Sequence, residues 1–272
     1  MKGSNLLGAV ALTTALLARS AAADNRIFTY TYEPETEPRG DWEFEQSITA
    51  RAGRTAAVGQ QAYQQWEFRT EIEYGFTDRY TAALYVNENF ERFTDPVTGA
   101  TTANNRWAGI SFENRYLVLD PVDHAIGLTL YIEPSYDGEN AELEEKIIIG
   151  QRYGDWKWAV NFTHATEWTD HFSESEGELE LTAGLARQLS RRWSLGVEIR
   201  EHNELPEYKT WENTVVFVGP VLSYRRNGWW ATLSVMPQVY GANFSGNPDQ
   251  NPHFELEGHE RLNVRLLAGF TF

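Results

Sequence analysis

Apolar and polar residues alternate with a period of two along most of this chain. The stretch "WEFRTEIEYGF" places Trp66, Phe68, Ile72, Tyr74 and Phe76 on one face and Glu67, Arg69, Glu71 and Glu73 on the other. Successive side chains of a strand point to opposite faces, so the pattern predicts a strand between an apolar and a polar environment. The stretch "RLNVRLLAGFTF" repeats the pattern and ends on Phe272.

Twelve segments carry this alternation. We expect strands near residues 42–50, 66–76, 79–90, 106–119, 124–136, 142–153, 156–168, 177–189, 192–202, 211–225, 229–240 and 259–272. Short turns at 77–79, 120–123, 154–155, 190–191 and 226–228 alternate with longer polar segments at 52–65, 91–105, 137–141, 169–176, 203–210 and 241–258. This alternation predicts an all-β fold, a transmembrane antiparallel up-and-down barrel of about 12 strands with lipid outside and a polar lumen inside.

The aromatic residues gather at both ends of these segments. The sequence has 10 Trp, 13 Tyr and 14 Phe. Near the short turns lie Trp42, Phe76, Tyr80, Tyr116, Trp156, Trp158, Trp193, Tyr224, Trp229, Trp230 and Phe272, and near the long segments lie Trp66, Phe90, Trp107, Tyr136, Trp168, Trp211 and Tyr240. Two such bands fit girdles at the two membrane interfaces. A soluble barrel or sandwich would scatter its aromatic residues along the strands.

Three regions follow from the order of these features. Residues 1–23 contain Lys2, an apolar run and three alanines before Asp24, which predicts a secretory signal peptide. Residues 24–40, in which Phe28, Tyr30 and Tyr32 alternate, form either a periplasmic arm or a segment that partly fills the lumen. Residues 41–272 form the barrel. The formal net charge of −16 argues against nucleic acid as a partner, and the absence of cysteine excludes disulfides.

The terminal strand, with Phe270 and Phe272, the signal peptide and the twelve segments together resemble outer-membrane β-barrels of Gram-negative bacteria. That resemblance implies a location in the cell outer membrane, contact with its lipids, and a C-terminal insertion signal at Phe270 and Phe272 that the barrel-assembly machinery reads. The stretch "YTYEPETEPRGDWEFEQ" is also similar to uncharacterised proteobacterial barrels. Neither resemblance implies a solute, a cofactor or catalytic residues.

Charges of both signs fall on the face that is expected to line the lumen. The lumen-lining residues that we expect are Glu67, Arg69, Glu71, Glu73, Glu113, Arg115, Glu144, Lys146, Glu178, Glu180, Glu198, Arg200, Arg261 and Arg265. One interpretation is a narrow channel for small polar or ionic solutes. The other is a plugged structural or binding barrel whose charges neutralise each other and through which nothing passes.

The stretch "THATEWTDHFSESEGE" contains the residue types of two further sites, a hydrolase site and a calcium site. His164, His171 and Ser173 include the residue types of a lipid hydrolase, but no catalytic motif surrounds them. Asp170, Glu174 and Glu176 could hold calcium, although acidic loops are usually only solvated. We therefore expect no enzymatic activity, no metal and no cofactor.

Overall fold

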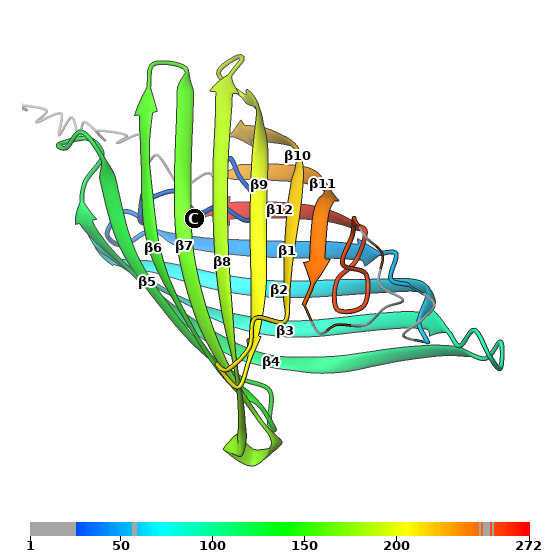
Figure 1. The fold of residues 1–272 in the computed structure, drawn as a ribbon. Coiled ribbons are helices and arrows are strands. Elements are labelled where there is room, and N and C mark those ends of the chain that lie inside the picture. The colour runs from blue at the N-terminus through cyan, green and yellow to red at the C-terminus, as the bar shows by residue number, and fades with distance from the viewer. Residues whose placement is uncertain (1–25, 56–58, 245, 247–250, 252) are drawn as a thin grey trace, which may run out of the picture.

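The protein is a closed antiparallel barrel of twelve strands (Figure 1). The computed structural model describes residues 26–55, 59–244, 246, 251 and 253–272. The strands are β1 (Trp42–Ala52), β2 (Gln61–Thr77), β3 (Tyr80–Thr94), β4 (Thr101–Leu119), β5 (Gly127–Tyr136), β6 (Ala141–Tyr153), β7 (Trp156–Thr169), β8 (Glu174–Gln188), β9 (Trp193–Pro206), β10 (Asn213–Arg226), β11 (Trp229–Asn243) and β12 (Leu262–Thr271). The expected fold class and strand number are confirmed.

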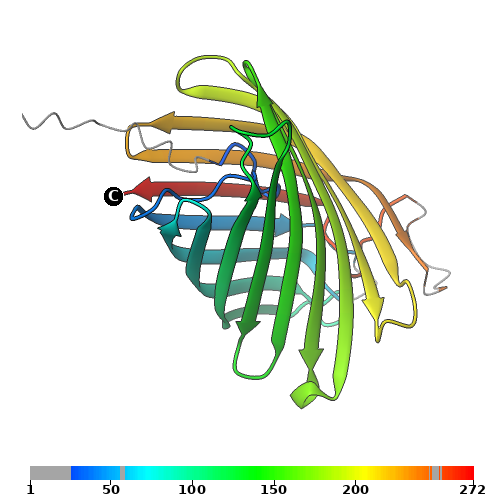
Figure 2. The ribbon, with the colours of Figure 1, turned by 90° about the vertical axis from the view of Figure 1, so that its left-hand side faces the viewer.

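Each strand pairs with its neighbours in the sequence, and β12 returns to pair with β1. The closing ladder runs from Glu43 opposite Thr271 to Ala52 opposite Leu262. The strands of opposite walls cross steeply in Figure 1, as the tilt of a closed barrel requires. We call the end that carries the β2–β3 and β10–β11 turns the short-turn end, and the opposite end the long-loop end. Phe272 lies at the short-turn end (Figure 2).

Several strands extend further toward the long-loop end than the sequence pattern indicates. The expected loop 91–105 is mostly strand, because β3 runs to Thr94 and β4 begins at Thr101. Likewise β8 begins at Glu174 and β9 continues to Pro206. These extensions are polar on both faces, so they carry no alternation in the sequence, yet their backbone groups still pair across the ladder. A 3-10 turn at Asp170–Phe172 joins β7 to β8.

The two faces of the barrel differ as the alternation predicts. Leu84, Phe112 and Phe162 on the outer face remain about half-exposed, at 54%, 47% and 53%, as expected of side chains that contact lipid. Trp230 is an exception to the expected aromatic band. It is fully buried, and its Nε1 donates to Glu43 Oε1 at 2.7 Å. Adjacent residues of a strand face opposite sides, so only Trp229 of this pair lies outside.

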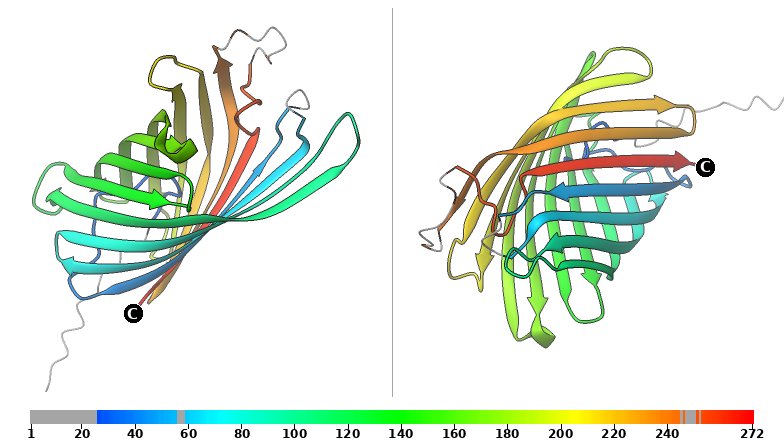
Figure 3. Two further views of the ribbon diagram at one scale, coloured as in Figure 1. Left: turned by 90° about the horizontal axis from the view of Figure 1, so that it is seen from below. Right: turned by 90° about the vertical axis from the view of Figure 1, so that its right-hand side faces the viewer.

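The described part of the N-terminal region, residues 26–40, runs inside the barrel. Figures 2 and 3 show this segment, drawn in blue, passing between the walls before it turns into β1. Phe28, Thr29 and Thr31 are fully buried. We call residues 26–40 the inner segment. The expected signal peptide, residues 1–23, lies outside the described residues. In the part of the chain that is described, no helix is long and apolar enough to cross a membrane.

The terminal residues generate a test of assembly. Phe272 is 72% exposed on the outer face, whereas Thr271 faces inward and its Oγ donates to Glu43 Oε2 at 2.8 Å. We expect Phe272→Asn to reduce the amount of folded barrel in the outer membrane severalfold, because it removes a lipid-facing aromatic residue from the expected insertion signal. Thr271→Asn, the matched control, should assemble almost normally. Heat-modifiable gel migration of outer-membrane fractions measures both, and equal assembly would contradict the prediction.

Candidate functional site

The inner segment is held in the lumen by one carboxylate of the barrel wall. Oε1 of Glu198, on β9, accepts the backbone N–H groups of Tyr30 at 2.7 Å and Thr31 at 2.6 Å. Oε2 accepts the backbone N–H of Thr29 at 3.1 Å and its hydroxyl at 2.9 Å. Hydrogen bonds to a charged acceptor are stronger than those between neutral groups. Glu198 therefore satisfies three successive backbone donors that would otherwise be buried without a partner.

Further wall residues hold the rest of the segment. Asn161, on β7, accepts the N–H of Tyr32 at 2.6 Å and donates to its carbonyl at 2.9 Å. Thr129 Oγ, on β5, donates to the Pro34 carbonyl at 2.5 Å. These contacts replace the strand partner that an isolated extended segment lacks, so the inner segment is bound as specifically as a strand in a sheet.

Small and apolar inward positions receive the side chains of the inner segment. Phe28 packs with Ala159, Ala186 and Val221, and a Cβ at Gly184 would lie 2.5 Å from the Phe28 ring. Tyr30 packs with Val215, Phe217 and Met236, and Tyr32 with Tyr131 and Ile148. The sequence alone did not predict these packing sites on the barrel wall. Their only signal was the stretch "NTVVFVGPVLSY", in which both faces are apolar.

Most of the charged residues expected in the lumen form ion pairs there. Arg69 contacts Glu133 at 2.6 Å, and Arg200 contacts Glu180 at 2.6 Å. The others of the expected set that pair are Glu67 with Arg51, Glu73 and Glu113 with Arg115, and Glu144 with Lys146. Glu71 is buried beside Glu45 and Glu73. Arg261 precedes β12, where its guanidinium stacks 3.9 Å from the centre of the Phe254 ring.

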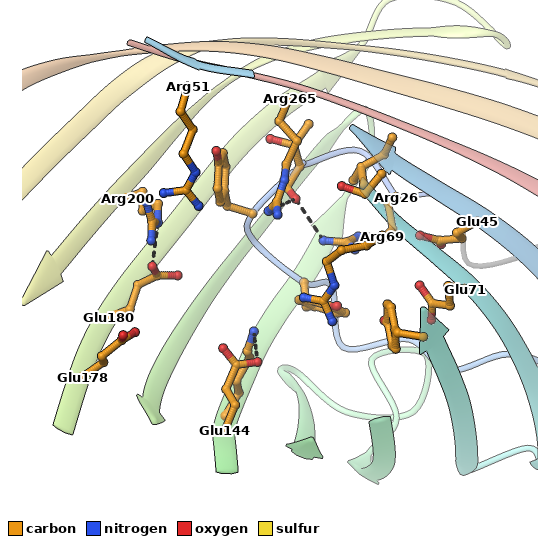
Figure 4. A pocket seen from close by; sticks show the side chains of 17 residues that line it. Arg26, Glu45, Arg51, Arg69, Glu71, Glu144, Glu178, Glu180, Arg200 and Arg265 are labelled. Carbon is orange, nitrogen blue, oxygen red and sulfur yellow. Dashed lines mark hydrogen bonds and ion pairs between the residues drawn. The ribbon is translucent and has the colours of Figure 1, made fainter. Parts of the chain in front are cut away.

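A polar cavity of about 140 Å³ remains between the inner segment and the wall (Figure 4). Five guanidinium groups point toward it, from Arg26 of the inner segment, Arg51 of β1, Arg69 of β2, Arg200 of β9 and Arg265 of β12. Carboxylates from several strands lie around them: Glu45, Glu71, Glu144, Glu178 and Glu180. The cavity thus brings together residues that are far apart in the sequence.

Two of these guanidinium groups are not matched by a neighbouring carboxylate. Arg265 Nε donates to Thr49 Oγ at 2.8 Å, and its Nη1 donates to the Thr29 carbonyl at 3.4 Å. Arg26 donates to the same carbonyl at 3.3 Å. Within the described residues, no carboxylate oxygen lies within 4.0 Å of either group. Arg265 instead stacks 4.2 Å over Tyr30, and Arg26 stacks 3.9 Å over Tyr32. Both cations can therefore attract an anionic group.

The residues considered for hydrolysis do not form a catalytic triad. His164 faces outward from β7, with Nδ1 3.5 Å from Glu145 and Nε2 3.1 Å from the Tyr208 hydroxyl. Ser173 Oγ donates to the Asp170 carboxylate at 2.6 Å, so its proton is not directed at a histidine. In the calcium site suggested by the sequence, Glu176 stands with Asp170 and Glu174. In the structure, its carboxylate lies instead beside those of Glu204 and Glu212.

The sequence profile of a family of unknown function, DUF6662, matches residues 20–147 and 149–272. The chain belongs to this family. No curated protein is significantly similar to it in sequence. The DUF6662 match covers the residues of the inner segment as well as those of the barrel.

Solved structures of outer-membrane barrels resemble the DUF6662 fold. The COG4313 outer membrane channel from Pseudomonas putida F1 has a TM-score of 0.59 at 11% identity, over 88% of this chain and 97% of that one. The NanC porin has 0.53 at 10%, over 84% and 98%. The KdgM porin in complex with disordered oligogalacturonate has 0.51 at 9%, over 85% and 99%. These similarities confirm the expected fold of an outer-membrane β-barrel.

Glu198 provides a test of the inner segment. We expect Glu198→Gln to lower the free energy of unfolding by about 2 kcal/mol, because the amide nitrogen would face backbone donors and the charge would be lost. Glu201→Gln is the matched control, since Glu201 lies on the outer face of the same strand and accepts from Asn203. Urea unfolding in lipid vesicles measures both. Equal stability of the two variants would contradict the anchoring role of Glu198.

Proposed function

We propose that the barrel is a narrow outer-membrane channel for small polar or ionic solutes, and that its cavity favours an anionic group. The observation that carries the proposal is the lumenal cavity in which Arg26 and Arg265 have no carboxylate within 4.0 Å among the described residues. A guanidinium with only neutral oxygen acceptors can exchange them for a carboxylate or phosphate of a passing solute.

The size of the cavity limits what it can hold. A volume of about 140 Å³ is that of a few water molecules, each of which occupies about 30 Å³ in the liquid. The walls carry alternating positive and negative groups, which favour a polar solute over an apolar one. The solute class is therefore small and hydrophilic.

The inner segment supports a second candidate, a plugged barrel that does not transport. Its contacts with Glu198, Asn161 and Thr129 hold it inside the lumen. In a channel, this segment is the constriction, and conductance rises when it detaches. In a plugged barrel, the ion pairs of the wall would keep the lumen closed even without the segment, so its detachment would change stability alone.

Arg265 allows the channel to be tested. We expect Arg265→Gln to lower the chloride-to-potassium permeability ratio severalfold, because it removes a positive charge that has no carboxylate within 4.0 Å among the described residues. Lys209→Gln is the control, since it removes the same charge from a loop where the side chain is 75% exposed. The reversal potential of the refolded protein in planar bilayers, under a KCl gradient, measures the ratio.

Two outcomes would overturn the channel. One is an equal change in selectivity for both variants, which would assign the effect to surface charge. The other is negligible conductance of the wild type together with negligible conductance of Glu198→Gln, which would favour the plugged barrel. A rise in conductance on Glu198→Gln would support the inner segment as the constriction.

A further inference from the structure

A second cluster of polar side chains lies in the lumen at the long-loop end. His202 and Glu204 face inward from β9, because they are two residues apart on one strand. His259 joins them from the segment between β11 and β12. One nitrogen of each histidine and one oxygen of Glu204 all lie within 4.8 Å of one another. Both histidines are 5% exposed.

The distances fit the coordination of a metal ion. His259 Nε2 lies 3.4 Å from Glu204 Oε1, and two tetrahedral ligands bound at zinc distances are about 3.4 Å apart. The two imidazole rings meet edge to face, with their centres 5.2 Å apart. His259 Nε2 is also 3.1 Å from Asn213 Oδ1. An ion would replace that amide oxygen as the partner of Nε2.

Glu178 borders the cluster beside His202. It lies on β8 opposite Glu204 in the strand register, and its Oε2 is 3.9 Å from His202 Nε2. The other ring nitrogen, Nδ1, lies 3.3 Å from Glu180 Oε2. A carboxylate that accepts from Nδ1 leaves the lone pair of Nε2 directed toward Glu178, and this arrangement is common around histidines that bind metals.

Charges near the cluster do not prevent a cation from binding. Arg200 Nη2 is 3.5 Å from His202 Nδ1, but its Nε is paired with Glu180 at 2.6 Å.

We propose that His202, Glu204 and His259 bind a divalent transition-metal ion, preferably zinc. Two imidazole ligands and one carboxylate ligand suit zinc, with a water molecule as the fourth ligand, whereas calcium and magnesium prefer oxygen alone. The site lies in the lumen, and it does not depend on transport.

Metal binding would fasten one segment of the chain to the barrel wall. The segment that carries His259 folds inward, where Gln238 Nε2 of β11 donates to the carbonyls of Glu255 at 2.7 Å and Glu260 at 3.1 Å. A shared ion would connect this segment directly to β9. Binding to the folded barrel alone therefore stabilises it.

Zinc titration of the refolded, chelator-treated protein tests the site. We expect one equivalent of zinc per barrel by calorimetry, and a visible cobalt(II) absorption spectrum typical of tetrahedral coordination. We expect His202→Gln and His259→Gln each to weaken zinc binding by at least about tenfold. His164→Gln is the control, because its side chain lies on the outer face with 41% exposure.

Heat-modifiable gel migration establishes that each variant is folded before titration. Absence of a stoichiometric zinc site in the wild type would overturn the proposal, and that result does not depend on any variant. Zinc binding that survives in the double variant His202→Gln/His259→Gln, or that His164→Gln removes, would also overturn it.

Discussion

The pairing of β1 with β12 is the constraint on which the rest of the structure depends. No water is present in the hydrocarbon core to satisfy backbone N–H and C=O groups, so a sheet can cross it only if its two edges meet. The two edges are joined by the pairing of residues 43–52 of β1 with residues 262–271 of β12, in which each residue lies opposite one partner. Closure divides every strand into an outer face in lipid and an inner face in a confined lumen. The alternation of the whole sequence follows from this division.

Confinement explains why the interior is so densely cross-linked. A charge held away from bulk water is costly unless a partner offsets it. The wall meets this requirement through ion pairs between neighbouring or facing strands, such as Arg69 with Glu133. The inner segment adds backbone donors, and Glu198 accepts three of them. Polar groups left over at the cavity and at the histidine cluster are then the ones available to solutes or ions.

The sequence predicts the barrel well because a lipid-facing strand must alternate. Residues such as Ile72 and Glu73 belong to opposite faces whatever their neighbours are, so period and turn spacing were sufficient. It predicts inward charges by the same rule. The sequence did not predict that Arg26 and Arg265 meet at one cavity, or that His259 lies beside His202. Those contacts depend on strand tilt and on two segments outside the barrel strands, namely residues 26–40 and 253–261. Trp230 was expected in the aromatic band on the outer face, which is wrong. Two adjacent tryptophans of a strand face opposite sides, and because both are apolar the pattern does not show which one contacts lipid.

The short connection between the inner segment and β1 has a kinetic consequence. The Gly40 N–H donates to the Gly75 carbonyl at 2.8 Å, so the last residue of the inner segment is fixed to β2. Residues 26–37 thus behave as a ligand tethered to its own receptor, and a short tether gives an effective concentration in about the millimolar range. Release would be followed by rapid rebinding rather than by escape. Excursions of this segment would therefore be brief, with a length set by the rebinding rate.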